Sequence, residues 1–359
     1  MATNSNKYND LVEKEIRAKI KEIELELPKF CKEYFIAIDN TTLPRTRLGY
    51  AYDIRLFFNF LENSNPELSK LGMRNFKLDI LDNITAMDIE EYMVYLKSYE
   101  KDGIEYSNKE NGIKRKMSSI RSLYAYFFKK ELISSNPTLM VNMPKLYEKA
   151  IIRLEPGEIA SLLDTVEMGT NMTKKQLETH KLTKTRDLAI LTLLLGTGIR
   201  VSECVGIDIQ DINFEDGQIL IHRKGGKEAM IYFGDEVEDA LRNYMFERND
   251  MKPTSGHENA FFLSLKNSRI SVRAVEMLVK KYSSLSSTVK HITPHKLRST
   301  YGTRLYEEEQ DIYLVAEILG HKDVNTTRRH YAATNEELKR NARNSVKLRE
   351  QWVKFNTKK

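Results

Sequence analysis

The sequence predicts a mainly α-helical protein with one small antiparallel β-sheet. Apolar residues recur at three- and four-residue spacing along most of the 359-residue chain, the pattern of helices that bury one face. Residues 218–223 and 229–233 instead read as two short strands around the glycine-containing turn at 224–227, which is a β-hairpin. Residues 136–150 contain two prolines and no clear periodicity, so they indicate a stiff tether between two units.

We accordingly expect an N-terminal unit at residues 1–140, a linker at 141–152 and a C-terminal unit at 153–359. The composition, 41% hydrophobic and 30% charged, is typical of globular domains and excludes collagen-like and low-complexity classes. The formal net charge of +6 permits a polyanionic partner. Spread over two units, that charge does not by itself indicate one.

Cysteine usage and apolar runs bear on the compartment. Cys31 and Cys204 are far apart and lack metal-ligand spacing, so they are predicted to be two buried thiols, as in a reducing compartment. No apolar segment opens the chain, and its longest apolar run, residues 188–195, is far below the roughly 18 residues of a membrane span. We therefore expect a cytoplasmic protein.

The N-terminal unit is predicted to be all-helical. Thr85 followed three residues later by Asp88 is a carboxylate variant of the capping box, which places a helix start there. Residues 101–112 are polar and contain glycine, so they read as a loop. The expected helical segments are residues 8–34 (one helix or a pair), 42–61, 87–99 and 113–130.

The last of these segments combines an apolar stripe with a basic face. Met117, Ile120, Tyr124 and Phe127 recur at helical spacing, while residues 109–130 hold seven cations and one acid. Such a face is either simply solvated or packed so that it offers cations to DNA phosphates. Under the second interpretation the DNA-contacting residues are Arg45, Arg47, Lys114, Arg115, Lys116 and Arg121.

The C-terminal unit is predicted to be helical around the hairpin. Residues 186–195 form an apolar buried helix, which the glycines Gly196 and Gly198 stop. Residues 170–185 are polar and lysine-rich, and read as an exposed loop or insertion. The other expected elements are helices at residues 155–163, 199–205, 236–248 and 271–283 and a strand at 260–265.

Residues 293–331 hold the most informative chemistry. Thr293 is a predicted N-cap with Pro294 at the first helical position, which puts His295 and Arg298 on one helix face. Gly320 precedes His321 where the next helix is expected to start, a place that favours anions.

Beyond this stretch, Tyr331 lies shortly before Thr334, which with Glu337 forms a capping box for a terminal helix at about 335–355. Taken singly, each histidine, arginine or tyrosine is more often structural than functional. Their order and spacing together match a known pattern.

That pattern is the one of the tyrosine recombinases, the phage-integrase family. Residues 196–203 (GTGIRVSE) resemble its first-arginine box, 295–298 (HKLR) its H-x-L-R box and 319–321 (LGH) its L-G-H box. Residues 224–228 (KGGKE) are similar to its K-G-x-K-E turn, and Tyr331 falls where the family carries its nucleophile. The resemblance covers roughly residues 29–346, with the N-terminal half matching only in pattern.

The resemblance implies a helical SAM-like core-binding domain and a mixed α+β catalytic domain that close as a C-shaped clamp on DNA. Ser299 stands where many members have histidine. Tyr301 and Tyr306 could serve as nucleophiles by type, although both lie too early in the pattern. The implied catalytic set is Arg200, Lys224, His295, Arg298, His321 and the nucleophile Tyr331, with Glu203 in support.

The residue types suit phosphoryl transfer. Two arginines can bind the non-bridging oxygens of a phosphodiester and stay charged at any working pH, so Arg200 and Arg298 would stabilise the transition state. Tyr331 would form a 3′-phosphotyrosine, with His295 as base and Lys224 protonating the leaving 5′-oxygen. His321 would hydrogen-bond the scissile phosphate. No cofactor or metal is expected, because arginines take the charge role of Mg²⁺.

The expected function is site-specific recombination through a Holliday junction, on double-stranded DNA with inverted-repeat sites. Within the family, a Xer-like enzyme of the single-recombinase type that resolves chromosome dimers is favoured over an integrase of a phage or conjugative transposon. A type IB topoisomerase would share the catalytic residue types but relax supercoils without site preference. The complete catalytic set argues against a non-catalytic DNA-binding protein on the same scaffold.

The resemblance also bears on partners. It implies a homotetramer on DNA that is linked by exchange of the terminal helix, although that helix could instead pack on its own domain. A DNA translocase is a further expected partner.

Overall fold

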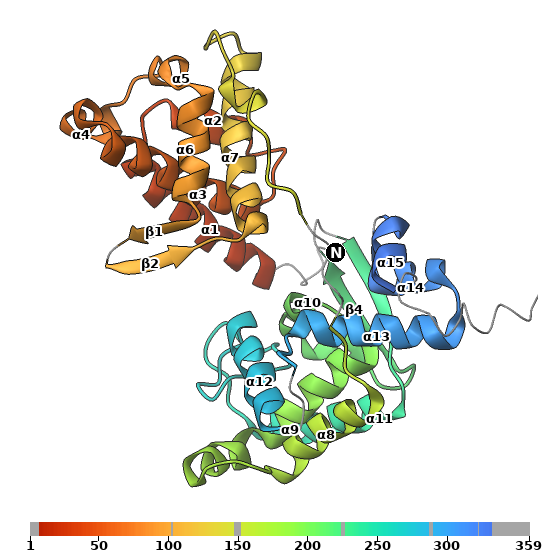
Figure 1. Cartoon of the computed structure of the whole chain (residues 1–359). Helices are drawn as coiled ribbons and strands as arrows, with labels where there is room; N and C mark the ends of the chain where they lie inside the picture. Colours follow the sequence, from red (N-terminus) through yellow and green to blue (C-terminus); the bar gives the residue numbers. More distant parts are fainter. Residues whose placement is uncertain are drawn as a thin grey trace, which may run out of the picture. The chain divides into compact units, whose positions relative to one another are not determined.

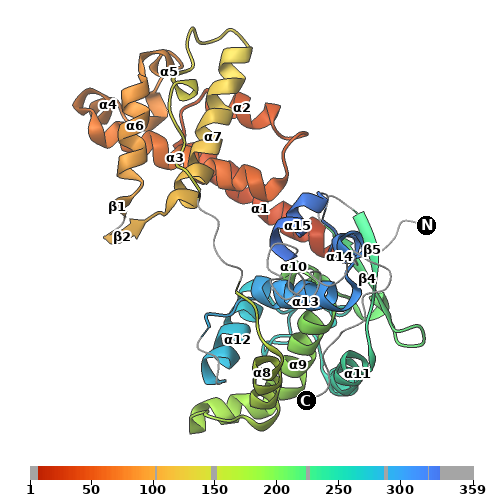
Figure 2. The ribbon, with the colours of Figure 1, turned by 45° about the vertical axis from the view of Figure 1, so that its right-hand side comes forward.

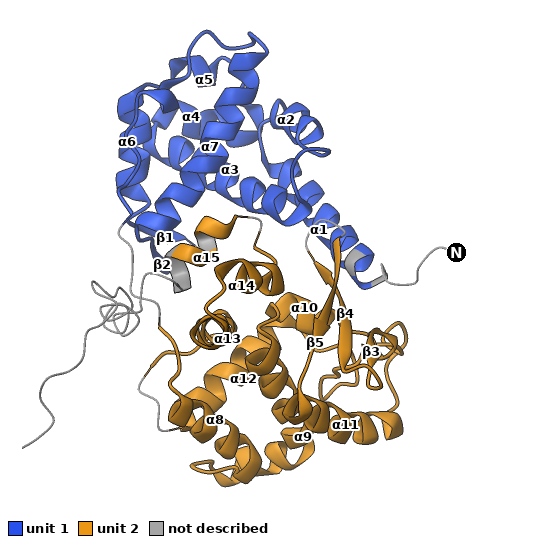
Figure 3. Cartoon of the chain, turned by 90° about the vertical axis from the view of Figure 1, so that its right-hand side faces the viewer, with its two compact units in different colours: residues 1–149 blue, residues 150–359 orange. Residues whose placement is uncertain are grey.

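The computed structural model describes residues 7–101, 103–146, 152–223, 227–286, 290–321 and 323–331. The chain forms two compact units, residues 1–149 and 150–359, coloured separately in Figure 3. The architecture is mainly helical, as predicted, and two small antiparallel sheets accompany the helices in the described part of the chain. Along the described ranges, no helix combines the length and apolar character needed to cross a membrane.

Unit 1 is built around α3, which packs against α1 on one side and α7 on another (Figure 1). The predicted stripe of α7 is fully buried, and its four residues Met117, Ile120, Tyr124 and Phe127 are each 0% exposed. The helices are α1 (Lys7–Glu26), α2 (Cys31–Ala37), α3 (Pro44–Ser64), α4 (Pro66–Leu71), α5 (Ile80–Asn83), α6 (Ala86–Tyr95) and α7 (Glu110–Lys129).

The predicted capping box starts α6. The Thr85 hydroxyl accepts from the Asp88 N–H, and the Asp88 carboxylate accepts from the Thr85 N–H at 2.7 Å. The helix ends at Tyr95, however, four residues before its expected end. A hairpin of β1 (Ser98–Lys101) and β2 (Ile104–Ser107) follows where a loop was expected. Gly103, with φ 74°, provides the positive dihedral that such a tight turn requires.

The first part of the expected linker packs on unit 1. The short 3₁₀ helix η3 (Pro137–Leu139) is followed by Val141, which is 3% exposed and whose carbonyl accepts from Arg121 at 2.8 Å. Burial of the Val141 side chain and this hydrogen bond fix these residues against unit 1, although composition alone predicted that they belong to the linker.

Unit 2 surrounds the long helix α9, with α8, α11 and α13 beside it (Figures 1 and 2). A three-stranded antiparallel sheet of order β3-β4-β5 completes the unit, and Arg223 pairs with Lys227 at the hairpin end. The elements are α8 (Pro156–Met168), α9 (Lys174–Thr197), α10 (Val201–Gly206), η4 (Ile209–Asp211), β3 (Ile212–Asn213), β4 (Gln218–Arg223), β5 (Lys227–Tyr232), α11 (Asp235–Asp250), α12 (Val272–Leu285), α13 (Pro294–Glu309), α14 (Ile312–Leu319) and α15 (Val324–Tyr331).

Two predictions for this unit were wrong. Residues 170–185 are mostly the first half of α9 and not a loop, because Thr173 and Gln176 form a reciprocal capping box that starts the helix. Residues 260–265 do not form a strand. They make isolated bridges instead, Asp208 with Ala260 and Leu263 with Arg269.

The two cysteines are buried free thiols, as predicted. Cys31 lies in α2 and Cys204 in α10, one in each unit. Burial raises the pKa of both thiols, so each remains protonated and unreactive at neutral pH.

The unexpected half of α9 carries a buried polar network that predicts pH-dependent stability. Tyr282 donates to Asp187 at 2.9 Å, and its hydroxyl lies 3.1 Å from His180 Nδ1. Burial lowers the pKa of His180, and Lys281 lowers it further. The neutral imidazole is therefore favoured in the folded state. Its stabilising contribution is complete above the unfolded pKa of about 6.5 and is lost as pH falls below it.

We expect wild type to lose more stability than His180→Gln between pH 7.5 and 5.5. One such group accounts for at most about 1.4 kcal/mol per pH unit. Urea unfolding followed by circular dichroism at both pH values measures the difference. Parallel losses in the two proteins would contradict the assignment to His180.

Candidate active site

The turn between α9 and α10 depends on a glycine. Gly198 ends α9 in a left-handed conformation with φ 62°, and its N–H donates to the Leu194 carbonyl. A Cβ at this position would lie 2.4 Å from Cδ1 of Tyr301 and 3.0 Å from Leu319. Glycine therefore satisfies both the backbone dihedral and the close approach of α13 and α14.

This turn places Arg200 immediately before α10. The buried carboxylate of Glu203 accepts from the Arg200 backbone N–H through one oxygen and from its Nη1 through the other, both at 2.7 Å. The Glu203 side chain is 3% exposed, whereas that of Arg200 is 39% exposed. The carboxylate thus orients a guanidinium that still faces solvent.

Arg298 approaches the same region from α13. It is 6% exposed, and its Nη1 donates to the Gly198 carbonyl at 2.6 Å while its Nη2 donates to the Leu319 carbonyl. The Nη2 of Arg200 lies 3.4 Å from the next carbonyl, that of Gly320. Two arginines 98 positions apart in sequence are therefore held at one helix end, since unpaired carbonyls and the helix dipole both attract cations there.

The two histidines occupy different settings. His295 is exposed in the first turn of α13, which starts at Pro294 with the Thr293 hydroxyl as its predicted cap. His321 is half-buried, and its Nδ1 lies 2.7 Å from the hydroxyl of Thr327, a fully buried residue of α15. This bond fixes the orientation of the ring. Thr327 was not predicted from the sequence, although its position six residues after His321 in the next helix was a usable signal.

One detail of the predicted site is wrong. His321 does not start the next helix, because α15 begins three residues later at Val324. The His321 N–H instead donates to the Ala316 carbonyl, beyond a left-handed Gly320 that ends α14. The residue belongs to the C-terminal cap of one helix, where backbone carbonyls and not N–H groups are presented.

Tyr331 is the last residue of α15. Its side chain lies outside the described part of the chain, and so do Lys224 and the predicted terminal helix. Of the two earlier tyrosines, Tyr301 packs its ring against the Gly198 turn and, with Tyr306, against the buried Val315 and Leu319. Burial raises the pKa of Tyr301, which opposes formation of the phenolate a nucleophile needs.

The predicted DNA-contacting cations of unit 1 divide by exposure into three groups. Arg45 and Lys114 are exposed, and Arg115 is 55% exposed although it binds both oxygens of the buried Asp53 at 2.7 Å. Arg47 is 4% exposed and forms an ion pair with Asp39. Because a buried cation must be paired, Arg47 serves the fold and is not a surface cation.

The remaining two cations are half-buried and engaged. Lys116 donates to the Asn108 side chain at 3.0 Å, and burial lowers its pKa. Arg121 donates to the Val141 carbonyl. Each of these two side chains is therefore engaged within unit 1.

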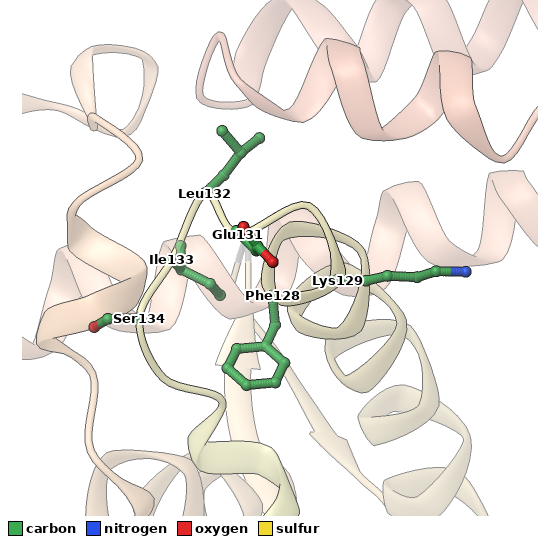
Figure 4. Close-up of a pocket in the computed structure, with 6 residues that line it drawn as sticks. All are labelled: Phe128, Lys129, Glu131, Leu132, Ile133 and Ser134. Atoms are coloured by element: carbon green, nitrogen blue, oxygen red, sulfur yellow. The ribbon is translucent and has the colours of Figure 1, made fainter.

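Unit 1 also has a surface pocket at the C-terminal end of α7 (Figure 4). None of the predicted catalytic or DNA-contacting residues lines it. Its lining residues are Phe128, Lys129, Glu131, Leu132, Ile133 and Ser134.

Arg200 and Arg298 converge on one turn, His321 follows that turn directly, and Tyr331 ends the next short helix. This arrangement is compatible with a phosphoryl-transfer enzyme that uses protein cations. Residues 153–337, more than half of the chain, match the Phage integrase family. The chain therefore belongs to the phage integrase family.

The curated relatives include tyrosine recombinases. A "Tyrosine recombinase XerC" of Caldanaerobacter subterraneus subsp. tengcongensis is 31% identical over 316 residues, 84% of this chain and 82% of that protein. A "Tyrosine recombinase XerS" of Lactococcus lactis subsp. cremoris is 28% identical over 348 residues, 89% of this chain and 96% of that protein. The chain is a Xer-like tyrosine recombinase, a site-specific enzyme that breaks and rejoins DNA.

The fold has solved counterparts as well. The Tn1549 transposon integrase, solved with circular intermediate DNA, superposes with a TM-score of 0.61 at 21% identity, covering 87% of this chain and 98% of that chain. At this identity the likeness concerns the fold, which it confirms.

Proposed function

We propose that this recombinase cleaves one DNA strand through Tyr331, forming a 3′-phosphotyrosine and a free 5′-hydroxyl, and reverses the step on a new partner strand. The phosphotyrosine conserves the energy of the phosphodiester, so rejoining needs no external energy source. The observation that carries the proposal is the placement of Arg200 and Arg298 at the end of α14.

In this proposal each site residue has one task. Arg200 and Arg298 stabilise the charge that develops on the non-bridging oxygens, and Glu203 orients Arg200. His295 takes the tyrosine proton, His321 hydrogen-bonds the phosphate, and Lys224 protonates the leaving 5′-oxygen. The exposure of His295 and the Thr327 bond to His321 are compatible with these tasks.

For the biological role we propose resolution of chromosome dimers in the cytoplasm, with integration of a mobile element as the second candidate. The two curated relatives described above carry Xer names, which favours the first, whereas the transposon integrase shares the fold. The enzyme would act as a tetramer clamped on inverted-repeat sites, linked by its terminal helices and activated by a translocase. In unit 1, Arg45, Lys114 and Arg115 would contact phosphates, since they are its exposed cations from the predicted set.

The test uses nicked DNA, in which the cleaved strand loses a short fragment and traps the covalent intermediate. One substrate carries an inverted repeat from near the replication terminus, and the other carries a junction of a mobile element. We expect an adduct on the terminus site, with the DNA attached to a peptide that contains Tyr331. An adduct on element junctions alone would overturn the chromosomal role, and no adduct on any site would overturn the mechanism.

A further inference from the structure

A third arginine binds the same helix end as the two proposed catalytic arginines. We call residues 318–320 the α14 terminal turn. Its Ile318 carbonyl accepts from Nη2 of Arg223 at 2.8 Å, its Leu319 carbonyl from Arg298, and its Gly320 carbonyl lies 3.4 Å from Arg200. Three guanidinium groups from three different elements therefore bind three successive carbonyls that the helix leaves unpaired.

Arg223 is packed directly against this turn. A Cβ at Gly320 would lie 2.1 Å from Nη1 and 2.5 Å from Cζ of Arg223, so only glycine leaves room for the guanidinium. The side chain is half-buried, and its Nε is buried without a hydrogen-bond partner among the residues that the structure describes. Burial lowers the pKa of Arg223, with Glu203 raising it and Arg200 lowering it, which puts all three charges in one neighbourhood.

This arrangement is costly for a residue with only a structural task. Desolvation disfavours a half-buried cation, and Arg200 adds a repulsion that the carboxylate of Glu203 opposes. An apolar side chain at the end of β4 would avoid the desolvation cost. The guanidinium of Arg223 instead fixes the position of the α14 terminal turn. This turn also binds Arg200 and Arg298, and His321 follows it directly. A shift of this turn would move both proposed phosphate ligands together, and catalysis is sensitive to displacements of about 1 Å.

We propose that Arg223 is a positioning residue of the active site, holding the α14 terminal turn so that Arg200 and Arg298 meet the scissile phosphate in the right geometry. The proposal rests on the phosphate-binding role of those two arginines. It assigns no contact between Arg223 and DNA.

The experiment compares full-length wild type and Arg223→Ala on two nicked substrates. One has an ordinary scissile phosphodiester, and the other has a methylphosphonate there, which carries no negative charge. On the phosphodiester we expect adduct formation to slow by about 10- to 100-fold, less than the 10²–10³-fold typical of a lost direct donor. On the methylphosphonate, the difference in rate between wild type and Arg223→Ala should become much smaller. A reacting phosphorus group without negative charge depends less on well-placed guanidinium groups. A merely structural defect slows both substrates equally, and that result would overturn the proposal.

Two controls separate this proposal from the one on which it rests. Arg298→Ala should likewise lose less rate, relative to wild type, on the methylphosphonate than on the phosphodiester. If it does not, the result contradicts the charge role of Arg298 and leaves the positioning role of Arg223 to be judged from its own variants. Arg242→Ala removes a half-exposed arginine that stacks at 4.6 Å over Phe214, and should match wild type on both substrates.

If Arg223→Ala does not fold, Arg223→Lys replaces it. Lysine keeps the positive charge but lacks the planar guanidinium group. Arg223→Lys should lose less rate of adduct formation than expected for Arg223→Ala, and this loss should be smaller still on the methylphosphonate. An equal loss of rate on both substrates would again overturn the proposal.

Discussion

Tyr331→Phe is expected to form no detectable covalent adduct on nicked site DNA. The substitution removes only the oxygen that would attack phosphorus, so the covalent bond between this residue and the DNA strand cannot form. Denaturing electrophoresis of end-labelled DNA measures the adduct, and a mobility-shift titration measures binding. We expect binding within about fivefold of wild type, because one hydroxyl contributes about 1 kcal/mol or less to a large polar interface.

The matched control is Tyr313→Phe. Tyr313 is 71% exposed on α14, so losing its hydroxyl should leave adduct formation unchanged. Persistence of the adduct in Tyr331→Phe would transfer the nucleophile to another tyrosine. Peptide mapping of the trapped complex would then identify that residue.

Arg298→Ala is expected to reduce adduct formation by at least about 10²–10³-fold, the loss typical of removing one transition-state donor. It should also destabilise unit 2 by about 1–3 kcal/mol, because the buried carbonyls of Gly198 and Leu319 lose their partner. Single-turnover cleavage and urea unfolding measure the two effects separately.

Arg298→Lys distinguishes charge from geometry. A lysine keeps the charge but lacks the planar guanidinium group that can bind two carbonyls and a phosphate at once. We therefore expect Arg298→Lys to retain most of the loss in cleavage rate. Recovery of wild-type cleavage in this variant would show that only the charge matters at this position.

Local signals predicted the start of helices well. Thr85 and Asp88 satisfy each other's backbone N–H groups, and the Thr293 hydroxyl accepts from the Lys296 N–H, so these effects can be read from neighbours in the chain. The same logic was available at Thr173 and Gln176, but the polar composition of residues 170–185 obscured it. His180 and Thr183 are buried there only because Tyr282 and Asp187 complete their hydrogen bonds.

The sequence by itself determined the chemistry of this protein, since the types and order of Arg200, His295, Arg298, His321 and Tyr331 already indicate phosphoryl transfer. Only the tertiary structure decided what each cation does. Arg47 is neutralised by Asp39, while Arg223, which no motif singled out, joins the turn that holds the two proposed catalytic arginines. The physical reason is that a charge acts through the groups within a few ångströms of it, and folding draws those groups from distant parts of the chain.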